Sequence, residues 1–378
     1  MKYVDEYRDA QAARHIAARI REEARPNRAY HFMEFCGGHT HAIFRYGIPR
    51  LLPDNVRMIH GPGCPVCVLP MHRVDLAIEL AHQPGVILCT YGDMMRVPGS
   101  RKRSLLTARA EGADVRMVYS VNDALTLARQ HPDRTVVFFA IGFETTTPPT
   151  AVALHTARRE KLSNFLVFCN HVLTPSAITA ILESPELREL GTLKLDGFIG
   201  PAHVSTVIGS QPYRYFAEEY HKPVVIAGFE PLDVLQAILM LIRQVNEGRA
   251  EVENEFSRAV TEGGNDRAKA LVADVFELRK SFLWRGLGQV PYSGLRIKAD
   301  YRDHDAEARF RLDVPVAREN KACECPAILR GVKAPRDCKL FGTVCTPENP
   351  IGSCMVSSEG ACAAYYTYGR YMETTHES

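Results

Sequence analysis

Long apolar segments are missing from this chain of 378 residues. No apolar run reaches the roughly 18 residues that a membrane-spanning helix needs, so we expect no membrane partner. The formal net charge is only +2, which gives no general attraction to nucleic acid. The N-terminal segment 1–6 is polar and has no signal-peptide core. Together these absences favour a cytoplasmic protein.

Nucleotide-binding motifs are also missing. The sequence contains no P-loop of the form G-x4-G-K-S/T and no glycine fingerprint for a dinucleotide. We therefore expect neither an ATP site nor an NAD site. Any driving force for chemistry must come from thiols, from a metal cluster or from a partner protein.

Cysteine is abundant, with 11 residues, but it is unevenly placed. None lies between positions 169 and 323. The six that follow form a cysteine-rich tail and are Cys323, Cys325, Cys338, Cys345, Cys354 and Cys362. In a reducing compartment, thiols are more often metal ligands or redox groups than structural disulfides. The cysteines therefore predict metal or redox chemistry.

Alternation of short apolar runs with amphipathic stretches predicts an α/β fold with parallel sheets. A helix is expected over 5–25, where apolar residues recur at helical spacing and Pro26 follows. Strands are expected at 30–35, 56–60, 86–89, 115–119, 135–141, 165–168, 197–199 and 224–227. Further helices are expected at 73–82, 122–131, 150–161, 176–182, 213–220 and 232–246.

The same pattern predicts three domains. Two parallel-sheet α/β domains are expected over 1–132 and 133–246. A smaller cysteine-rich iron–sulfur domain is expected over 247–378, because the pattern changes to short strands, prolines and cysteines after Trp284. We expect a helix at 267–280 to pack against the cysteine-rich tail.

The run Gly61-Pro62-Gly63-Cys64-Pro65-Val66-Cys67 contains the most informative pair of cysteines. Glycine and proline set a tight turn between a predicted strand and a predicted helix. At such a corner, open α/β sheets place their chemistry. The pair is either a redox dithiol or half of a metal site, and the pair alone leaves both interpretations open.

A second group consists of Cys36, His39 and His41, just after the first predicted strand. Two glycines follow Cys36 and let a ligand approach the backbone closely. Cys36 is a candidate nucleophile or soft metal ligand, and we expect a nearby histidine to lower its pKa.

The six tail cysteines suit a cubane iron–sulfur cluster, because loops rich in glycine and proline let four thiolates converge. Zinc is the competing interpretation, although the tail has no Cys-x2-Cys knuckle. The spacing does not indicate which four thiols would bind a cluster.

Three motifs resemble those of the hydrogenase maturation factor HypD family. They are Phe35-Cys36-Gly37-Gly38-His39-Thr40-His41, the run 61–67, and Gly352-Ser353-Cys354-Met355-Val356-Ser357-Ser358-Glu359-Gly360-Ala361-Cys362. The resemblance spans 34–368. It implies two α/β domains plus a third domain that carries a 4Fe–4S cluster. It also implies a role, together with HypC, as the scaffold on which the Fe(CN)2CO unit of NiFe hydrogenases is assembled.

The resemblance further implies that HypE delivers cyanide as a thiocyanate. Carried over to this chain, Cys36 would be a ligand of the transient iron that bears CN and CO. Cys64 and Cys67 would form a redox dithiol near that iron. His39 and His41 would belong to the same catalytic group.

The tail also resembles ferredoxin:thioredoxin reductase, in which a cubane lies beside a redox disulfide. By that analogy, Cys323, Cys338, Cys345 and Cys362 would bind the cluster. Cys325 and Cys354 would form the adjacent disulfide. The chain would then be a redox-active assembly scaffold rather than a conventional turnover enzyme. Two alternatives remain: a stand-alone iron–sulfur thiol-disulfide oxidoreductase, and a zinc-stabilised binding module.

Overall fold

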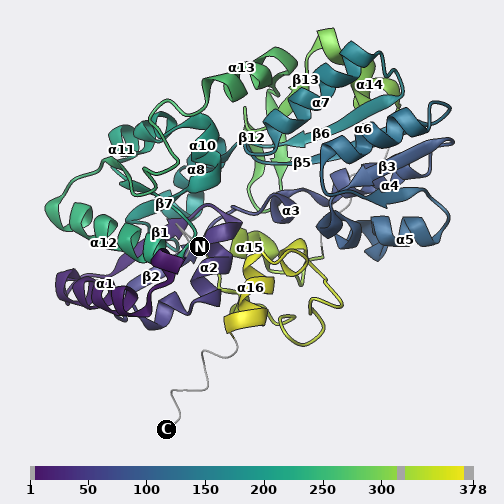
Figure 1. Ribbon diagram of the computed structural model, residues 1–378. Helices are drawn as coiled ribbons and strands as arrows, with labels where there is room; N and C mark the ends of the chain where they lie inside the picture. The colour runs from purple at the N-terminus through teal and green to yellow at the C-terminus, as the bar shows by residue number, and fades with distance from the viewer. Residues whose placement is uncertain (1–4, 313–319, 370–378) are drawn as a thin grey trace.

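The computed structural model describes residues 5–312 and 320–369, and parallel sheets form the frame of its α/β fold (Figure 1). Sheet A has the strand order β2-β1-β7-β8-β9. Its strands are β1 (Tyr30–Glu34), β2 (Val56–His60), β7 (Gly197–Pro201), β8 (Val224–Ala227) and β9 (Val252–Asn254). In register, Glu34 at the end of β1 lies opposite His60 at the end of β2.

Sheet B has the strand order β4-β3-β5-β6. Its strands are β3 (Val86–Thr90), β4 (Val115–Met117), β5 (Thr135–Gly142) and β6 (Phe165–His171). Every residue of β3 and β6 is buried. These strands are continuous apolar runs because helices cover both faces of a parallel sheet.

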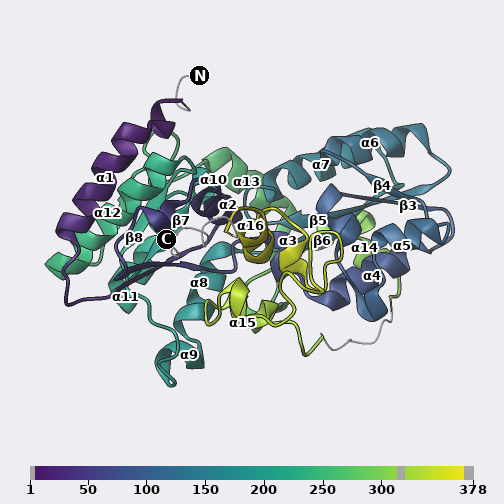
Figure 2. The same cartoon turned by 90° about the horizontal axis from the view of Figure 1, so that it is seen from below.

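Helices cover both faces of each sheet (Figures 1 and 2). On sheet A, α1 (Ala10–Glu23), α2 (Gly37–Arg45) and α12 (Pro231–Glu247) share one apolar core. The opposite face carries α10 (Ala202–Ile208) and α11 (Arg214–Tyr220). On sheet B, one face packs against α6 (Val121–Gln130) and α7 (Thr147–Glu160). The other packs against α4 (Met71–Ala81) and α5 (Leu105–Ala110), whereas α8 (Thr174–Leu182) lies in the half of the molecule that holds sheet A (Figures 1 and 2).

The predicted strands and helices of the α/β region are confirmed, with small shifts at their ends. The helix expected over 5–25 is divided into a 3₁₀ turn, Asp5–Arg8, and α1. The division falls at Asp9, whose side chain accepts a hydrogen bond from the backbone N–H of Ala12. An aspartate that caps a helix in this way fixes where the helix begins.

The helix expected at 267–280 is shorter than predicted and packs elsewhere. α13 (Asp266–Val275) ends where β10 (Phe276–Leu278) begins, because Phe276 pairs with Ile297 of β13 (Leu295–Ile297). Apolar side chains of this region join the core of sheet B, and α13 packs on α7. The expectation that this helix packs against the cysteine-rich tail is therefore wrong. A hairpin of β11 (Ser281–Trp284) and β12 (Gly288–Pro291) follows β10.

The sheets do not follow the division expected at 132/133. Sheet B takes β3 and β4 from one side of that position and β5 and β6 from the other. Sheet A likewise joins β1 and β2 to β7 and β8, and it gains β9 from beyond position 246. The chain leaves sheet A after β2, builds all of sheet B, and returns to place β7 beside β1.

The tail lies between the two sheets, next to α2 and α3 (Figures 1 and 2). It contains α15 (Cys325–Leu329), the 3₁₀ turn Ser353–Met355 and α16 (Ala361–Tyr368). The remaining short helices are α3 (Pro65–Val68), α9 (Pro185–Arg188) and α14 (Ala306–Arg309). No helix in the described ranges has the length and apolar character needed to cross a membrane.

Candidate functional site

Cys36 lies at the point where β1 ends and α2 begins, and it occupies the N-cap position of α2. Two glycines allow other segments to close in on it. If Gly37 carried a Cβ atom, that atom would lie 2.7 Å from Oε2 of Glu359 in the tail, closer than van der Waals contact allows. At Gly38 it would lie 2.8 Å from the ring of Phe229. Cys36 itself remains partly exposed.

The electrostatics around Cys36 differ from the expectation. Burial raises the pKa of the Cys36 thiol, and the carboxylates of Glu359 and Glu34 raise it further. Backbone N–H groups of Gly38 and His39 act in the opposite direction but do not prevail. The expectation that a nearby histidine lowers this pKa is therefore wrong. Both carboxylates favour the neutral thiol, so binding of a cation would be needed to hold the thiolate.

Glu34 organises the surroundings of Cys36. It is fully buried and accepts a hydrogen bond of 2.8 Å from the backbone N–H of Cys36. Thr40 Oγ1 donates to its other oxygen, and His60 Nδ1 lies 2.8 Å from that same oxygen. The carboxylate thus fixes the start of α2 against the end of β2.

The two predicted histidines point in different directions. His39 is buried, and its Nε2 lies 3.0 Å from the Ala227 carbonyl oxygen and 2.9 Å from that of Gly228. Burial lowers the pKa of His39, so the ring is a neutral donor to these carbonyls at the end of β8. His41 lies instead against the tail, with Nδ1 3.3 Å from the Ser358 carbonyl oxygen.

Cys64 and Cys67 form a disulfide with their Cα atoms 5.2 Å apart. Cys64 caps α3, since its sulfur accepts a hydrogen bond of 3.2 Å from the backbone N–H of Cys67. The turn is pressed against Cys36: a side-chain carbon at Gly63 would lie 2.6 Å from the Cα of Cys36. The backbone N–H of Gly37 also donates to the Gly63 carbonyl. The pair and Cys36 therefore belong to one site, as expected for adjacent strand ends.

The disulfide also contacts the tail directly. Ser353 Oγ donates to the Cys67 carbonyl at 2.9 Å, and the Cys67 sulfur lies 3.9 Å from the Ser353 carbonyl oxygen. The buried guanidinium of Arg285 donates to Ser353 Oγ at 2.8 Å, while the Arg285 backbone N–H donates to Val68. Ser353 immediately precedes Cys354, so the tail thiols begin one residue from this contact.

Several tail thiols converge around Cys325. Side-chain hydrogen bonds link Cys325 to Cys323, Cys354 and Cys362. A side-chain carbon at Gly352 would lie 2.5 Å from the Cys325 sulfur and 2.6 Å from that of Cys323. Cys325 and Cys354 are free thiols in the structure, so their disulfide stays a prediction.

Hydrogen bonds from Cys325 and Cys362 lower the pKa of Cys354 to about 5, against the opposing effect of burial. Four soft thiols on converging loops match the donor set of a cubane in number and chemistry. Within residues 5–312 and 320–369, however, no group of three or more His, Cys, Asp or Glu side chains is arranged to hold a metal ion. The predicted ligand set Cys323, Cys338, Cys345 and Cys362 remains a prediction.

Several residues of the site were not among the sequence candidates: Glu34, Ser353, Glu359 and Arg285. Glu34 is an acidic residue at the end of a buried strand, two positions before Cys36, and that pattern is present in the sequence. Arg285 follows the only tryptophan and has no sequence pattern that would associate it with the cysteines.

Known proteins similar to this chain share its full length. The family HypD, described as "Hydrogenase formation hypA family", matches residues 11–369. The hydrogenase maturation factor HypD of Cupriavidus necator is 68% identical over 373 residues, covering 99% of this chain and 98% of that protein. The one from Azotobacter vinelandii is 70% identical over 370 residues, covering 98% and 97%. The one from Escherichia coli K12 is 47% identical over 373 residues, covering 97% and 98%. The chain therefore belongs to the HypD family of hydrogenase maturation factors.

Proposed function

We propose that this chain is the scaffold on which the Fe(CN)2CO unit of NiFe hydrogenases is assembled. Its partners in this proposal are a HypC-like small chaperone, which shares the iron, and a HypE-like protein, which donates cyanide as a thiocyanate. Assembly would take place in the cytoplasm. Cys36 is the proposed ligand through which the chain holds the iron, which is cargo rather than a resident cofactor.

One observation carries the proposal: Cys36, the Cys64–Cys67 pair and the tail are in contact within a single site. Gly63 lies against the backbone of Cys36, and Ser353 bonds to the Cys67 carbonyl. In the proposal, the iron ligand and the two-electron thiol couple are neighbours, and this arrangement would let cyanide be released next to the iron.

The chemistry of cyanide transfer balances with the residues at hand. Cleavage of the S–CN bond of a thiocyanate takes two electrons and leaves a thiol on the donor. The dithiol of Cys64 and Cys67 supplies two electrons and two protons when it closes to a disulfide. One proton goes to the donor sulfur and the other leaves with cyanide as HCN. The cyanide carbon then binds iron as the anion, and the proton is released.

A 4Fe–4S cluster in the tail is part of the proposal. When bound, such a cluster supplies single electrons. The protein residues do the rest: Ser353 and Arg285 hold the tail against the Cys64–Cys67 turn. Gly352 leaves the space that the sulfurs of Cys323 and Cys325 occupy.

Infrared spectroscopy tests the iron assignment, because bound CN and CO absorb where protein does not. The chain is co-purified with its HypC-like partner from cells that also contain the HypE-like donor. We expect the CN and CO bands in the wild type and in Cys89→Ala, a buried-cysteine control in β3. We expect Cys36→Ala to lack them. Unchanged bands in Cys36→Ala would show that Cys36 does not hold the iron.

Iron content tests the cluster ligands. Each tail cysteine is replaced by alanine in turn, and iron and sulfide are measured after anaerobic purification. We expect loss of the cluster in the variants of Cys323, Cys338, Cys345 and Cys362, and its retention in those of Cys325 and Cys354. An intact cluster in Cys338→Ala would contradict this ligand set. It would favour instead Cys323, Cys325, Cys354 and Cys362, the thiols that hydrogen bonds link.

Burial of the Cys64–Cys67 pair argues against a stand-alone thiol-disulfide oxidoreductase. Cys64 is 3% exposed and Cys67 is 0% exposed. Exchange with a folded client would require direct attack on one of these sulfurs, which depends on access. Reduction of a small thiocyanate group, carried on a flexible terminus of the donor, would need less access to these sulfurs.

A further inference from the structure

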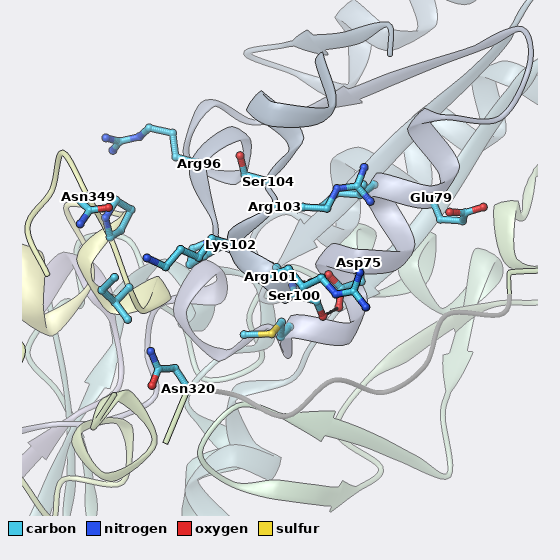
Figure 3. Close-up of a pocket in the computed structure, with 16 residues that line it drawn as sticks. Asp75, Glu79, Arg96, Ser100, Arg101, Lys102, Arg103, Ser104, Asn320 and Asn349 are labelled. Atoms are coloured by element: carbon cyan, nitrogen blue, oxygen red, sulfur yellow. Dashed lines mark hydrogen bonds between the residues drawn. The ribbon is translucent and has the colours of Figure 1, made fainter. Parts of the chain in front are cut away.

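A cavity of about 740 Å³ separates the helices of sheet B from the tail. One wall is formed by one side of α4, from Met71 to Glu79, and by residues of segment 96–104. The other is formed by 349–351 of the tail, with Asn320 at the edge. Figure 3 shows Lys102 extending across the cavity toward Asn349 and Asn320, while Arg101 and Arg103 lie on the side of Asp75 and Glu79. The cavity is large enough for a peptide segment or a drug-sized ligand.

The cavity is rich in cations. Four basic residues line it: Arg96, Arg101, Lys102 and Arg103. Arg96 bonds to the Pro347 and Val356 carbonyls at 3.0 Å each. Arg103 is paired with Glu111. No hydrogen bond or ion pair holds the side chains of Arg101 and Lys102 in the ranges that the structure describes, and both residues are exposed.

The acidic side chains that line the cavity are already engaged. The Asp75 carboxylate accepts hydrogen bonds from Ser100, at 2.7 Å from its backbone N–H and 2.5 Å from its hydroxyl. Glu79 accepts from Gln83. These donors are uncharged, so the lining carries four cations against two carboxylates and has a net positive charge.

The backbone at Arg101 and Lys102 is strained. Arg101 has φ of 54° and Lys102 has φ of 61°. Glycine or asparagine would occupy this left-handed region more easily than a long side chain. The strained turn is anchored by Asp75 and by a bond of 2.7 Å from the Gly99 N–H to the Arg103 carbonyl. It holds two adjacent long cations at the cavity.

We propose that this cavity binds a carboxylate-rich segment of a maturation partner. Unpaired cations select an anionic occupant, and walls from both the sheet B helices and the tail suit an extended chain that touches both. The inference rests on the proposed function in naming a maturation partner. The cavity lies close to the thiols, because Met71 follows the Cys64–Cys67 turn and Ile351 donates to the Cys345 sulfur.

Fluorescence anisotropy tests the proposal with the full chain and a fluorescein-labelled peptide of alternating Glu and Gly at low ionic strength. We expect binding that weakens as salt is added. The variant Arg101→Asn/Lys102→Asn is expected to bind about tenfold more weakly. The control Arg159→Gln/Lys194→Gln removes the same charge from exposed positions outside the cavity. It is expected to bind as the wild type does.

Thermal unfolding of the same variants separates binding from folding. Asparagine tolerates positive φ, so the cavity variant should unfold at the wild-type temperature or above it. Equal loss of binding in variant and control would overturn the proposal, as would full competition by inorganic phosphate or by a single-stranded oligonucleotide of equal charge. Cys36→Ala should bind the peptide normally, so a failure here is distinct from a failure of the iron assignment.

Discussion

Glu34 is a buried carboxylate that joins two strand ends to the candidate iron ligand. Its oxygens receive hydrogen bonds from the backbone of Cys36, the hydroxyl of Thr40 and the ring of His60. Its own carbonyl accepts from the N–H of Gly61, where the cysteine turn begins. Glu34 therefore contributes, through its side chain and its backbone, to holding Cys36 near the Cys64–Cys67 turn. A buried carboxylate with this many donors is costly to replace by an apolar residue.

Glu144 provides a pH-dependent prediction at the residue scale. Burial raises the pKa of Glu144 to about 7, although Thr174 donates to it through its N–H and hydroxyl. In the unfolded chain a glutamate titrates near 4.3. The folded state therefore keeps its proton longer, and the stability of the protein falls as pH rises between these two values. The full loss amounts to about 4 kcal/mol once the pH is above 7.

The test compares the wild type with Glu144→Gln by urea unfolding at pH 5 and pH 8. We expect the wild type to lose about 3 kcal/mol relative to the variant between the two conditions. The difference between the proteins isolates Glu144, because all other groups titrate in both. Parallel pH profiles would contradict the raised pKa.

Glu307 provides a second prediction. It pairs with Arg73 at 2.6 Å and with Arg279, and Arg73 is buried. Burial alone would raise the pKa of Glu307, but the two guanidinium groups lower it. Glu307→Gln leaves both cations without their counter-charge. We expect a loss of about 2 kcal/mol in unfolding free energy.

Glu160→Gln is the matched control, because Glu160 forms an exposed pair with Arg129. Exposed pairs contribute little, so its unfolding free energy should stay near that of the wild type. If the two variants lose equal stability, the Arg73 contact contributes no more than a surface pair.

At the scale of elements, glycine determines how closely the cysteine turn approaches Cys36. A side-chain carbon at Gly63 would lie 2.6 Å from the Cα of Cys36, and backbone atoms cannot yield. Gly63→Ala should therefore separate the two loops and destabilise the protein by about 1–3 kcal/mol. Gly263 has open space around it, so Gly263→Ala should be neutral. Urea unfolding measures both, and a neutral Gly63→Ala would show that the turn can shift without cost.

Local pattern was enough to predict most elements and the cysteine motifs. Strands such as β5 and β6 are continuous apolar runs, and capping residues such as Ser120 mark where helices begin. The end of α13 was missed because Phe276 also fits a helical pattern. Its pairing with Ile297, which lies 21 positions away, decides the structure. The direction of His41 could not be predicted either, since it depends on where the tail packs.

At the scale of the whole molecule, the sequence does not predict which strands share a sheet. Neighbouring strands in the sequence were expected to share a domain, yet β1 lies beside β7, with all of sheet B between them in the chain. No local pattern encodes such a return. The same limit applies to the tail, whose position between the sheets places Glu359 over Gly37 and Ser353 beside Cys67.

Ser353 tests whether the tail holds the thiol turn in place. It is fully buried, donates to the Cys67 carbonyl and accepts from the Arg285 guanidinium. Ser353→Ala removes both bonds and leaves two buried polar groups without this partner, at an expected cost of about 1–3 kcal/mol. Ser358→Ala, on the same loop but exposed, should cost little. The single tryptophan, buried Trp284, reports unfolding by fluorescence.

Hydrogen exchange then separates local from global effects in these two variants. If Ser353 joins the tail to the turn, Ser353→Ala should speed exchange at the amides of Cys67 and Val68 more than in β5 of sheet B. Both amide N–H groups donate to the Cys64 carbonyl, so their exchange rates report whether the turn is closed. Uniform acceleration across the molecule would mean that Ser353 stabilises the fold as a whole. The contact between the thiol turn and the tail would then not depend on this hydroxyl.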